Sequence, residues 1–148
     1  MKLPTVIFDI DGTLADIAHR RVYLDEKPKN WARFNNEMGA DTPNNPIVRL
    51  YKTLWDSGAY KLEIVTGRDE RFREVTEQWL TWNDIPFKRL SMRGENDYRA
   101  DHIIKKEILD KFLSEGANIL FCVDDRAQVV NMWRENGITC LQCDVGDF

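Results

Sequence analysis

Cysteine, histidine and long apolar stretches are scarce in this sequence. Among its 148 residues there are three cysteines and two histidines, and an odd number of cysteines argues against the disulfide framework of a small secreted protein. No apolar run approaches the roughly 18 residues that a membrane span needs. The first residues also lack the pattern of a signal peptide. A cytoplasmic protein without a membrane segment is therefore expected.

A basic charge balance is missing too. The formal net charge is −4, whereas a protein that coats long nucleic acid is usually basic, because neutralising phosphates supplies most of that affinity. A local basic pocket for one or two phosphates remains compatible with this balance. The phosphate-binding loop G-x-x-x-x-G-K-[ST] is also absent, so no kinase domain is expected in this chain. The sequence gives no indication of the oligomeric state.

The few cysteines and histidines raise the question of a zinc site. Cys140 and Cys143 have the spacing of a zinc ligand pair, but no second pair accompanies them and residues 138–145 have the pattern of a strand. Structural cysteines are the favoured interpretation, with zinc as the minor alternative. His19 and His102 have no motif partner, and both are expected to be solvated surface side chains.

Segments with the patterns of strands and helices alternate along the chain. Apolar segments typical of strands cover residues 3–9, 61–68, 87–92, 118–125 and 138–145. Amphipathic segments typical of helices cover residues 29–40, 45–58, 69–84, 100–116 and 126–137. Strands separated by helices of this length indicate βαβ units and a parallel sheet. The sequence therefore predicts an α/β fold, a three-layer Rossmann-like parallel sheet with helices on both faces.

A small cap and several local details complete the predicted fold. Residues 1–148 are expected to form a single domain, with a small helical cap insertion at residues 16–45. Trp31 and Phe34 either line this cap over the site or pack within its helix. Gly67 is expected to break the second strand. In the helix after the cap, the expected buried stripe comprises apolar residues at helical spacing: Ile47, Leu50, Tyr51, Leu54 and Trp55.

Polar side chains follow three of the predicted strands where these strands end. They form three groups: Asp9 and Asp11, then Thr66, Gly67 and Arg68, then Asp124, Asp125 and Arg126. Taken singly, each group is more typical of a turn or a helix N-cap. Because the carboxyl ends of parallel strands share one edge of a sheet, all three groups are expected to converge. The repulsion between buried carboxylates then requires a cation, and Mg²⁺ prefers such oxygen ligands.

Four short motifs cover nearly the whole chain: "DIDGTLAD", "IVTGR", "IIKKEIL" and "CVDDR". In this order they resemble the motifs of the haloacid dehalogenase-like phosphohydrolases, the first of which reads D-x-D-G-T. The segments "TGRDE", "RADHIIKKEIL", "VDDRAQVVNMW" and the final "GDF" carry a narrower similarity. They resemble the 3′-phosphatase domains of phage-type polynucleotide kinase/3′-phosphatases. The cap segment at residues 16–45 departs from that domain.

The resemblance implies phosphoryl transfer through an aspartyl-phosphate. Asp9 would be the nucleophile. Asp11 would act as general acid and then as general base, and a pKa raised near the phosphate would suit the acid role. Mg²⁺ is implied as the cofactor. The aspartates of the first and fourth motifs are its implied ligands: Asp9, Asp11 through its backbone carbonyl, Asp124 and Asp125.

Thr66 and Lys105 complete the implied catalytic set. Thr66 would donate a hydrogen bond to a phosphoryl oxygen, and Lys105 would offset the charge on Asp9 and on the phosphate. Lys106 is a rival for this role. Because a helix turns by about 100° per residue, only one of these two lysines can face the site. Lys105 is preferred because it aligns with the lysine of the family.

The resemblance also implies a set of substrate-binding residues: Gly67, Arg68, Arg93, Arg99 and Asp101. The arginines would bind phosphate bidentately, and Asp101 would orient one of them or the lysine. The alternative is that these side chains are ordinary surface charges, with Asp101 as a helix N-cap.

Together these features indicate a Mg²⁺-dependent phosphohydrolase that removes 3′-phosphates from nucleic-acid ends. Only about 30 residues form the cap, too few for a large lid, so an extended substrate could enter. The alternative is a 5′(3′)-nucleotidase or another small-molecule phosphomonoesterase. A binding module without catalysis is disfavoured, because every residue type that the chemistry requires is present.

Overall fold

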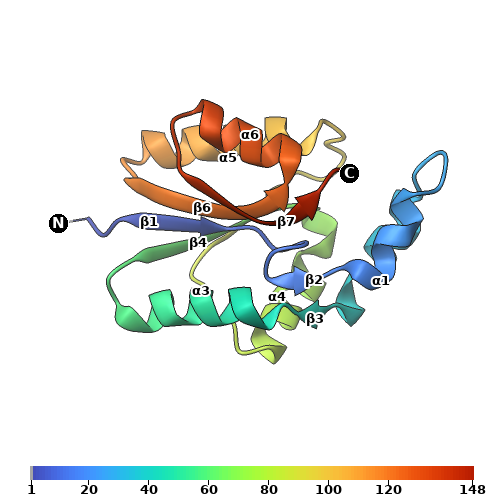
Figure 1. Cartoon of the computed structure of the whole chain (residues 1–148), viewed down its shortest axis with the longest axis horizontal. Helices are drawn as coiled ribbons and strands as arrows, with labels where there is room; N and C mark the ends of the chain where they lie inside the picture. The colour runs from blue at the N-terminus through green and yellow to red at the C-terminus, as the bar shows by residue number, and fades with distance from the viewer. Residues whose placement is uncertain (1) are drawn as a thin grey trace.

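The centre of the protein is a five-stranded parallel sheet (Figure 1). In the computed structural model, which describes residues 2–148, the strands lie in the order β5-β4-β1-β6-β7. Their bounds are β1 Thr5–Phe8, β4 Lys61–Asp69, β5 Leu90–Arg93, β6 Ile119–Arg126 and β7 Cys140–Gly146. All four residues of the central strand β1 are buried, as expected for a strand that is covered on both faces.

Two helices cover each face of the sheet. Their bounds are α3 Asn45–Ser57, α4 Arg73–Trp82, α5 Asp101–Ser114 and α6 Ala127–Glu135. Helices α3 and α4 lie on one face, and α5 and α6 lie on the other (Figure 1). The strand order explains this arrangement, because right-handed crossovers that run in opposite directions along a sheet place their helices on opposite faces. The predicted three-layer α/β fold is confirmed. Within residues 2–148, no helix is both long and apolar enough to span a membrane.

Side chains from β1 enter two separate hydrophobic cores. Val6 and Phe8 belong to the core beneath α3 and α4, where the ring of Phe8 meets that of Tyr51 edge-on with centroids 5.1 Å apart. Ile7 belongs to the core beneath α5 and α6, which also contains Trp133. This alternation fixes the register of β1 and therefore the direction in which the residues after it leave the sheet.

The cap is an insertion between β1 and α3. Its base is a short antiparallel pair, β2 (Ala15–Asp16) and β3 (Thr42–Pro43). Between these strands lie α1 (Ala18–Arg21) and α2 (Trp31–Asn36), with 3₁₀ turns at Val22–Leu24 and Met38–Ala40. The helical insertion expected in this part of the chain is therefore present, and it projects to one side of the sheet (Figure 1).

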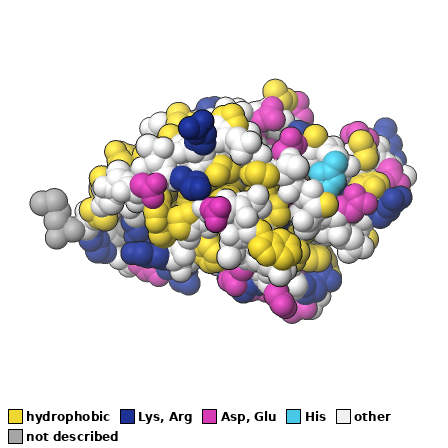
Figure 2. All heavy atoms as spheres, turned by 90° about the horizontal axis from the view of Figure 1, so that it is seen from below, with side chains coloured by type: hydrophobic (Ala, Val, Ile, Leu, Met, Phe, Trp, Pro, Cys, Tyr) yellow, Lys and Arg dark blue, Asp and Glu magenta, His cyan; other side chains and the backbone are white. Residues whose placement is uncertain are grey.

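Helix α3 packs on a face slightly different from the expected stripe. Val48 and Tyr51 are its fully buried side chains, whereas Leu50 is 36% exposed, so its assignment to the stripe was wrong. Tyr51 is held on this buried face, because its hydroxyl donates to the backbone oxygen of Pro86 at 2.6 Å. Figure 2 shows the resulting α3/α4 face, on which apolar side chains are exposed among charged ones.

The cysteines of β7 lie on opposite sides of the sheet. Cys140 is in the core beneath α5 and α6, together with Cys122 of β6. Cys143 packs against the other core, since residues three apart on a strand point to opposite faces. The two thiols therefore do not form a ligand pair.

Candidate active site

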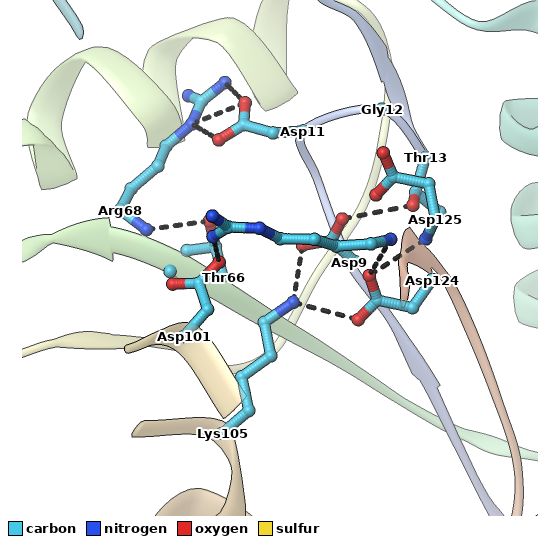
Figure 3. Close-up of polar contacts among 12 residues, drawn as sticks. Asp9, Asp11, Gly12, Thr13, Thr66, Arg68, Asp101, Lys105, Asp124 and Asp125 are labelled. Atoms are coloured by element: carbon cyan, nitrogen blue, oxygen red, sulfur yellow. Dashed lines mark hydrogen bonds and ion pairs between the residues drawn. The ribbon is translucent and has the colours of Figure 1, made fainter. Parts of the chain in front are cut away.

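The carboxyl ends of β1, β4 and β6 meet at one edge of the sheet. Parallel pairing places Phe8 of β1 level with Ile64 of β4 and Val123 of β6. Asp9 and Asp124 directly follow two of these residues, and both are buried. The predicted convergence of the strand ends is confirmed, and Figure 3 shows the resulting cluster of side chains.

A buried lysine joins the two strand-end aspartates. Lys105 Nζ donates to Asp9 Oδ1 at 2.8 Å and to Asp124 Oδ2 at 2.9 Å, while the Thr13 hydroxyl donates to Asp9 Oδ2 at 3.1 Å. Burial and the charge of Asp124 raise the pKa of Asp9 against the opposing effect of Lys105. Lys106 instead pairs with a carboxylate on the exposed side of α5. The prediction that Lys105 faces the site is confirmed.

Asp9, Asp124 and Asp125 form a group with the character of a divalent-cation site. One ligand oxygen from each lies within 4.8 Å of the others. Both carboxylate oxygens of Asp125 are buried without a hydrogen-bond partner among the described residues. Burial and the charge of Asp124 raise the pKa of Asp125 to about 7. An unpartnered carboxylate beside two others is an oxygen donor set that fits Mg²⁺.

Gly12 makes room for the Asp125 carboxylate. Its φ is +79°, in the left-handed region, and a Cβ at this position would lie 2.0 Å from Asp125 Oδ2. Any side chain here would therefore displace that carboxylate. The glycine of the D-x-D-G-T motif thus has a packing role beside the acidic group.

The carboxylate of Asp11 points away from the other three aspartates (Figure 3). Arg68 Nη2 donates to it at 2.7 Å and Arg20 Nη2 at 2.5 Å. Although burial opposes ionisation, Arg68 and Arg20 lower the pKa of Asp11 below its ordinary range. The two arginines thus engage the Asp11 carboxylate in the ligand-free site. A pKa raised by bound phosphate and metal ligation through the Asp11 backbone carbonyl stay predictions.

Arg20 and Asp41 form a buried ion network in the cap that no sequence motif indicates. Asp41 accepts from Arg20 Nε at 2.8 Å, from Arg20 Nη2 at 2.7 Å and from Arg68 Nη2 at 3.2 Å. His19 Nε2 lies 2.7 Å from the same carboxylate, so this histidine is not simply solvated as expected. Because Arg20 also contacts Asp11, the network ties the cap to the site. An arginine within a short basic run gives no signal of burial in the sequence.

Gly67 does not end β4, contrary to the prediction that it breaks this strand. β4 continues through Gly67 to Asp69, with only a shift in its pairing to β5. A Cβ on Gly67 would lie 2.1 Å from Asp101 Oδ1, so glycine is needed here for close approach rather than for a break. The neighbouring Thr66 is buried, and its hydroxyl oxygen accepts from the backbone N–H of Arg68 at 3.2 Å.

Arg93 holds backbone rather than pointing freely into the site. Its guanidinium donates to the backbone oxygens of Gly67 and Asp97, each at 2.9 Å, and to that of Arg99. It also donates to Asp101 Oδ1 at 2.6 Å. Arg99 is half-exposed and pairs with Asp97 at 2.7 Å. Both arginines line the cavity, where nearby acceptors engage them, and their binding of phosphate stays a prediction.

Asp101 forms ion pairs with two arginines beside the site. It accepts from Arg93 and, at 2.8 Å, from Arg126 Nη1. Burial opposes its ionisation, but Lys105 first, then Arg126 and Arg93, lower the pKa of Asp101. Asp101 therefore orients an arginine, as the sequence analysis inferred, and its helix has no side-chain N-cap bond.

A cavity of about 680 Å³ opens above this cluster. Asp9, Asp124 and Lys105 form part of its floor, and the cap contributes Trp31 and Phe34 to its wall. The two rings also pack edge-on with centroids 5.6 Å apart. Both alternatives considered for these residues therefore hold, since they pack together and line the cavity.

The fold and this site define a haloacid dehalogenase-like phosphohydrolase, the class that the motifs resemble. A haloacid dehalogenase-like hydrolase of Streptococcus pneumoniae shares the fold at 16% identity, with a TM-score of 0.62 over 95% of this chain and 84% of that one. The family model described as the polynucleotide kinase PNKP phosphatase domain matches residues 3–148. The chain therefore belongs to the PNKP phosphatase-domain family, and it is a phosphatase.

Two solved structures of the Pnkp1/Rnl/Hen1 complex, one described as an RNA repair complex, contain a similar domain. Each is 38% identical to this chain, with a TM-score of 0.80. The first match covers 100% of this chain and 48% of the other chain, and the second covers 99% of this chain and 44% of the other. A protein of Autographa californica nuclear polyhedrosis virus, whose proposed assignment is a bifunctional polynucleotide kinase/RNA ligase, is 26% identical over 136 residues. That match covers 90% of this chain and 18% of the viral protein. The chain thus spans less than half the length of these relatives.

Proposed function

We propose that this phosphatase removes 3′-phosphates from nucleic-acid ends through an aspartyl-phosphate on Asp9, with Mg²⁺ as cofactor. Residues 1–148 would act as one phosphatase domain. The single observation that carries the chemistry is the buried cluster in which Lys105 bridges Asp9 and Asp124 beside the unpartnered Asp125. The family match over residues 3–148 supports the choice of substrate.

Asp9, Asp124 and Asp125 would hold the metal. Their oxygens lie close together, and the buried Asp125 carboxylate has no other partner among the described residues. When bound, Mg²⁺ would neutralise negative charge on the phosphoryl oxygens. Asp11 would contribute its backbone carbonyl, because its carboxylate is engaged by Arg20 and Arg68.

The nucleophile and the acid/base residue are held by different partners. Asp9 would attack phosphorus in line, and the bond from phosphorus to the 3′ oxygen would break. Asp11 would give its proton to that oxygen and later take one from water. Arg20 and Arg68 keep Asp11 ionised in the free enzyme. The negative charge of the bound phosphate would favour protonation of Asp11 for the first step.

Thr66 and Lys105 would stabilise the phosphoryl group during its transfer. The Thr66 hydroxyl accepts a backbone hydrogen bond, so its own O–H is left to donate to a phosphoryl oxygen. Lys105 would offset the charge that builds up around Asp9. Arg93 and Asp101 would act on the substrate indirectly, by holding the backbone that surrounds Gly67.

The substrate assignment is tested by release of inorganic phosphate from matched oligonucleotides. DNA and RNA strands with a 3′-phosphate are compared with the same strands carrying a 5′-phosphate, and with a panel of mononucleotides. We expect kcat/KM to be highest for a 3′-phosphorylated strand. Higher values for mononucleotides or other small phosphomonoesters would refute the assignment and favour a nucleotidase.

Mg²⁺ is expected to stabilise the protein more at pH 8 than at pH 6. The pKa of Asp125 is raised from 3.8 to about 7, so its carboxyl keeps a proton in the folded state that the unfolded chain releases. The metal-free protein should therefore lose stability as pH rises from about 4 to about 7. Mg²⁺ must displace this proton, and at about 100 times its Kd it would add about 2.7 kcal/mol once the carboxylate is free.

Thermal unfolding with EDTA or Mg²⁺ measures this effect. The Asp125→Asn variant serves as the comparison, since it cannot titrate and should show little difference between the two pH values. A Tm that is indifferent to Mg²⁺ at both pH values would contradict the metal assignment.

Arg20→Met is expected to raise the pKa of Asp11 and to destabilise the cap. Because Asp11 must carry a proton in the first step, loss of one of its two contacting cations should move the alkaline limb of the kcat–pH profile upward by roughly one unit. In the wild type, the ion pairs of Asp11 stabilise the fold above its ordinary pKa of 3.8 and are lost as pH falls. The free energy of unfolding of the variant should fall less on acidification than that of the wild type. At neutral pH it should be about 3–5 kcal/mol lower, because Asp41 loses a buried partner.

Arg33→Met is the matched control for Arg20→Met. Arg33 is an exposed arginine of the same cap and donates to the hydroxyl of Tyr23 rather than to Asp11. Its replacement should leave the pH profile unchanged. An identical shift in both variants would show that Arg20 does not act through Asp11.

A further inference from the structure

Two exposed aromatic side chains line the mouth of the cavity. Trp31 is the first residue of α2 and is 42% exposed, and Tyr98, in the segment between β5 and α5, is 82% exposed. Both belong to the lining of the cavity that contains Asp9. Large aromatic surfaces are usually buried, so a pair left open at the rim of a catalytic cavity offers flat apolar faces to a ligand.

Trp31 is held firmly in relation to the acid/base residue. Its ring packs edge-on against the buried Phe34 with centroids 5.6 Å apart. The guanidinium of Arg20 lies 4.3 Å from the Phe34 ring centroid on one side and contacts Asp11 on the other. A chain of direct contacts thus runs from the exposed indole to Asp11.

The backbone on both sides of Tyr98 is held as well. Arg93 donates to the backbone oxygens of Asp97 and Arg99, which are the two neighbours of Tyr98 in the chain. The Tyr98 hydroxyl donates to Asn96 Oδ1 at 3.3 Å. The bonds of Arg93 therefore fix the position from which this phenol ring projects.

Two cations lie beside the Trp31 ring. The Lys29 ammonium is 5.9 Å from the centroid of Trp31, and the Arg126 guanidinium is 6.0 Å from it. Aromatic faces interleaved with cations are the combination that binds single-stranded nucleic acid, since each base stacks and each phosphate meets a positive charge. A small phosphomonoester without a base would use neither feature.

We propose that Trp31 and Tyr98 stack against the bases of the last unpaired nucleotides of the substrate strand. This inference rests on the proposed function. The base and the 3′-phosphate are attached to the same sugar ring, so a phosphate at Asp9 places its own base near the mouth of the cavity. A paired terminal base is covered on one face by the next base pair and on its edge by its partner, so only its outer face is free. The enzyme therefore prefers unpaired 3′ ends and tolerates any base, since stacking carries little sequence information.

A strand whose 3′-terminal nucleotide lacks its base tests this stacking. It keeps the sugar and the 3′-phosphate, and it is compared with the otherwise identical normal strand. Loss of one stacked base should lower kcat/KM of the wild type by about tenfold or more, mainly through KM. Trp31→Ala and Tyr98→Ala should lower kcat/KM for the normal strand, and at least one of them should have no further effect on the baseless strand.

Conservative and remote substitutions supply the controls. Trp31→Phe and Tyr98→Phe keep a stacking face and should retain most of the activity on the normal strand. Trp82→Ala should leave kcat/KM unchanged for both strands, because Trp82 is 70% exposed on α4 and lies outside the cavity lining. A blunt duplex with the same 3′-phosphate should be hydrolysed more slowly than the single strand.

The outcomes separate this inference from the proposed function. If the wild type hydrolyses the normal and the baseless strands equally well, the stacking proposal is wrong and the 3′-phosphatase assignment stands. Equal losses of the alanine variants on both strands would also overturn it, since they would indicate a structural role. If no 3′-phosphorylated strand is hydrolysed, both proposals fail.

Discussion

Replacement of Asp9 by asparagine should lower kcat by at least about ten-thousand-fold, because an amide keeps the shape of the carboxylate but is a very poor nucleophile. The fold should survive. Asp9 is one of three crowded carboxylates, and burial together with the charge of Asp124 already opposes its ionisation. Removing this charge should leave the metal-free protein at least as stable as the wild type.

Phosphate release and thermal unfolding together check the Asp9 prediction. Asp144→Asn is the matched control, because Asp144 is exposed on β7 and does not line the cavity. It should behave like the wild type in both measurements. Substantial turnover by the Asp9→Asn protein would remove Asp9 from the role of nucleophile.

Lys105→Met should abolish activity and also destabilise the protein by about 3–5 kcal/mol, the effect expected when one partner of a buried ion pair is removed. Methionine has a similar length but carries no charge. Asp9 and Asp124 would then face each other and Asp125 without the ammonium that now donates to two of them. The like charges would repel in a buried site.

Lys106→Met is the control for the lysine prediction. Lys106 is the next residue of the same helix, but it pairs with Asp110 on the exposed side, and its loss should change stability by less than about 0.5 kcal/mol. Denaturant unfolding of both variants measures the difference. Saturating Mg²⁺ should restore part of the stability lost in Lys105→Met, since it also supplies positive charge. Equal stability of the two variants would contradict the bridging role of Lys105.

The sequence predicts the sheet and the aspartate cluster because both depend on local patterns. Buried strands are apolar runs, and the residue that follows such a run in a parallel sheet must emerge at its carboxyl edge. That rule brings Asp9 and Asp124 together although 115 positions separate them along the chain. Helical periodicity lets only one of Lys105 and Lys106 face the site, and the family resemblance selects Lys105. The sheet and the aspartate cluster follow from the spacing of a few neighbouring residues.

The environment of Asp11 could not be predicted in the same way. Its pKa and its orientation depend on Arg20, which lies in a short irregular cap and is buried there by contacts with Asp41 and Phe34. A basic residue is usually solvated, and no local pattern indicates that this one is enclosed. The partners of Arg93 are hidden for a related reason, since they are backbone oxygens brought near by the turn before α5.

Gly67 illustrates a third limit of local reasoning. A glycine in a strand suggests a break, yet here the strand continues and the missing side chain admits the carboxylate of Asp101. The close approach involves a helix that begins more than thirty positions later in the chain. Only the assembled fold shows which of the usual reasons for a strand glycine applies.

The configuration at phosphorus tests the central claim most directly. A strand is prepared whose 3′-phosphorothioate is chiral through an oxygen isotope, and it is hydrolysed by the Mg²⁺-loaded enzyme in isotopically labelled water. Transfer to Asp9 and then to water involves two in-line displacements, each of which inverts phosphorus, so the released thiophosphate should show overall retention. Overall inversion would mean that water attacks the 3′-phosphate directly, and it would contradict the role assigned to Asp9.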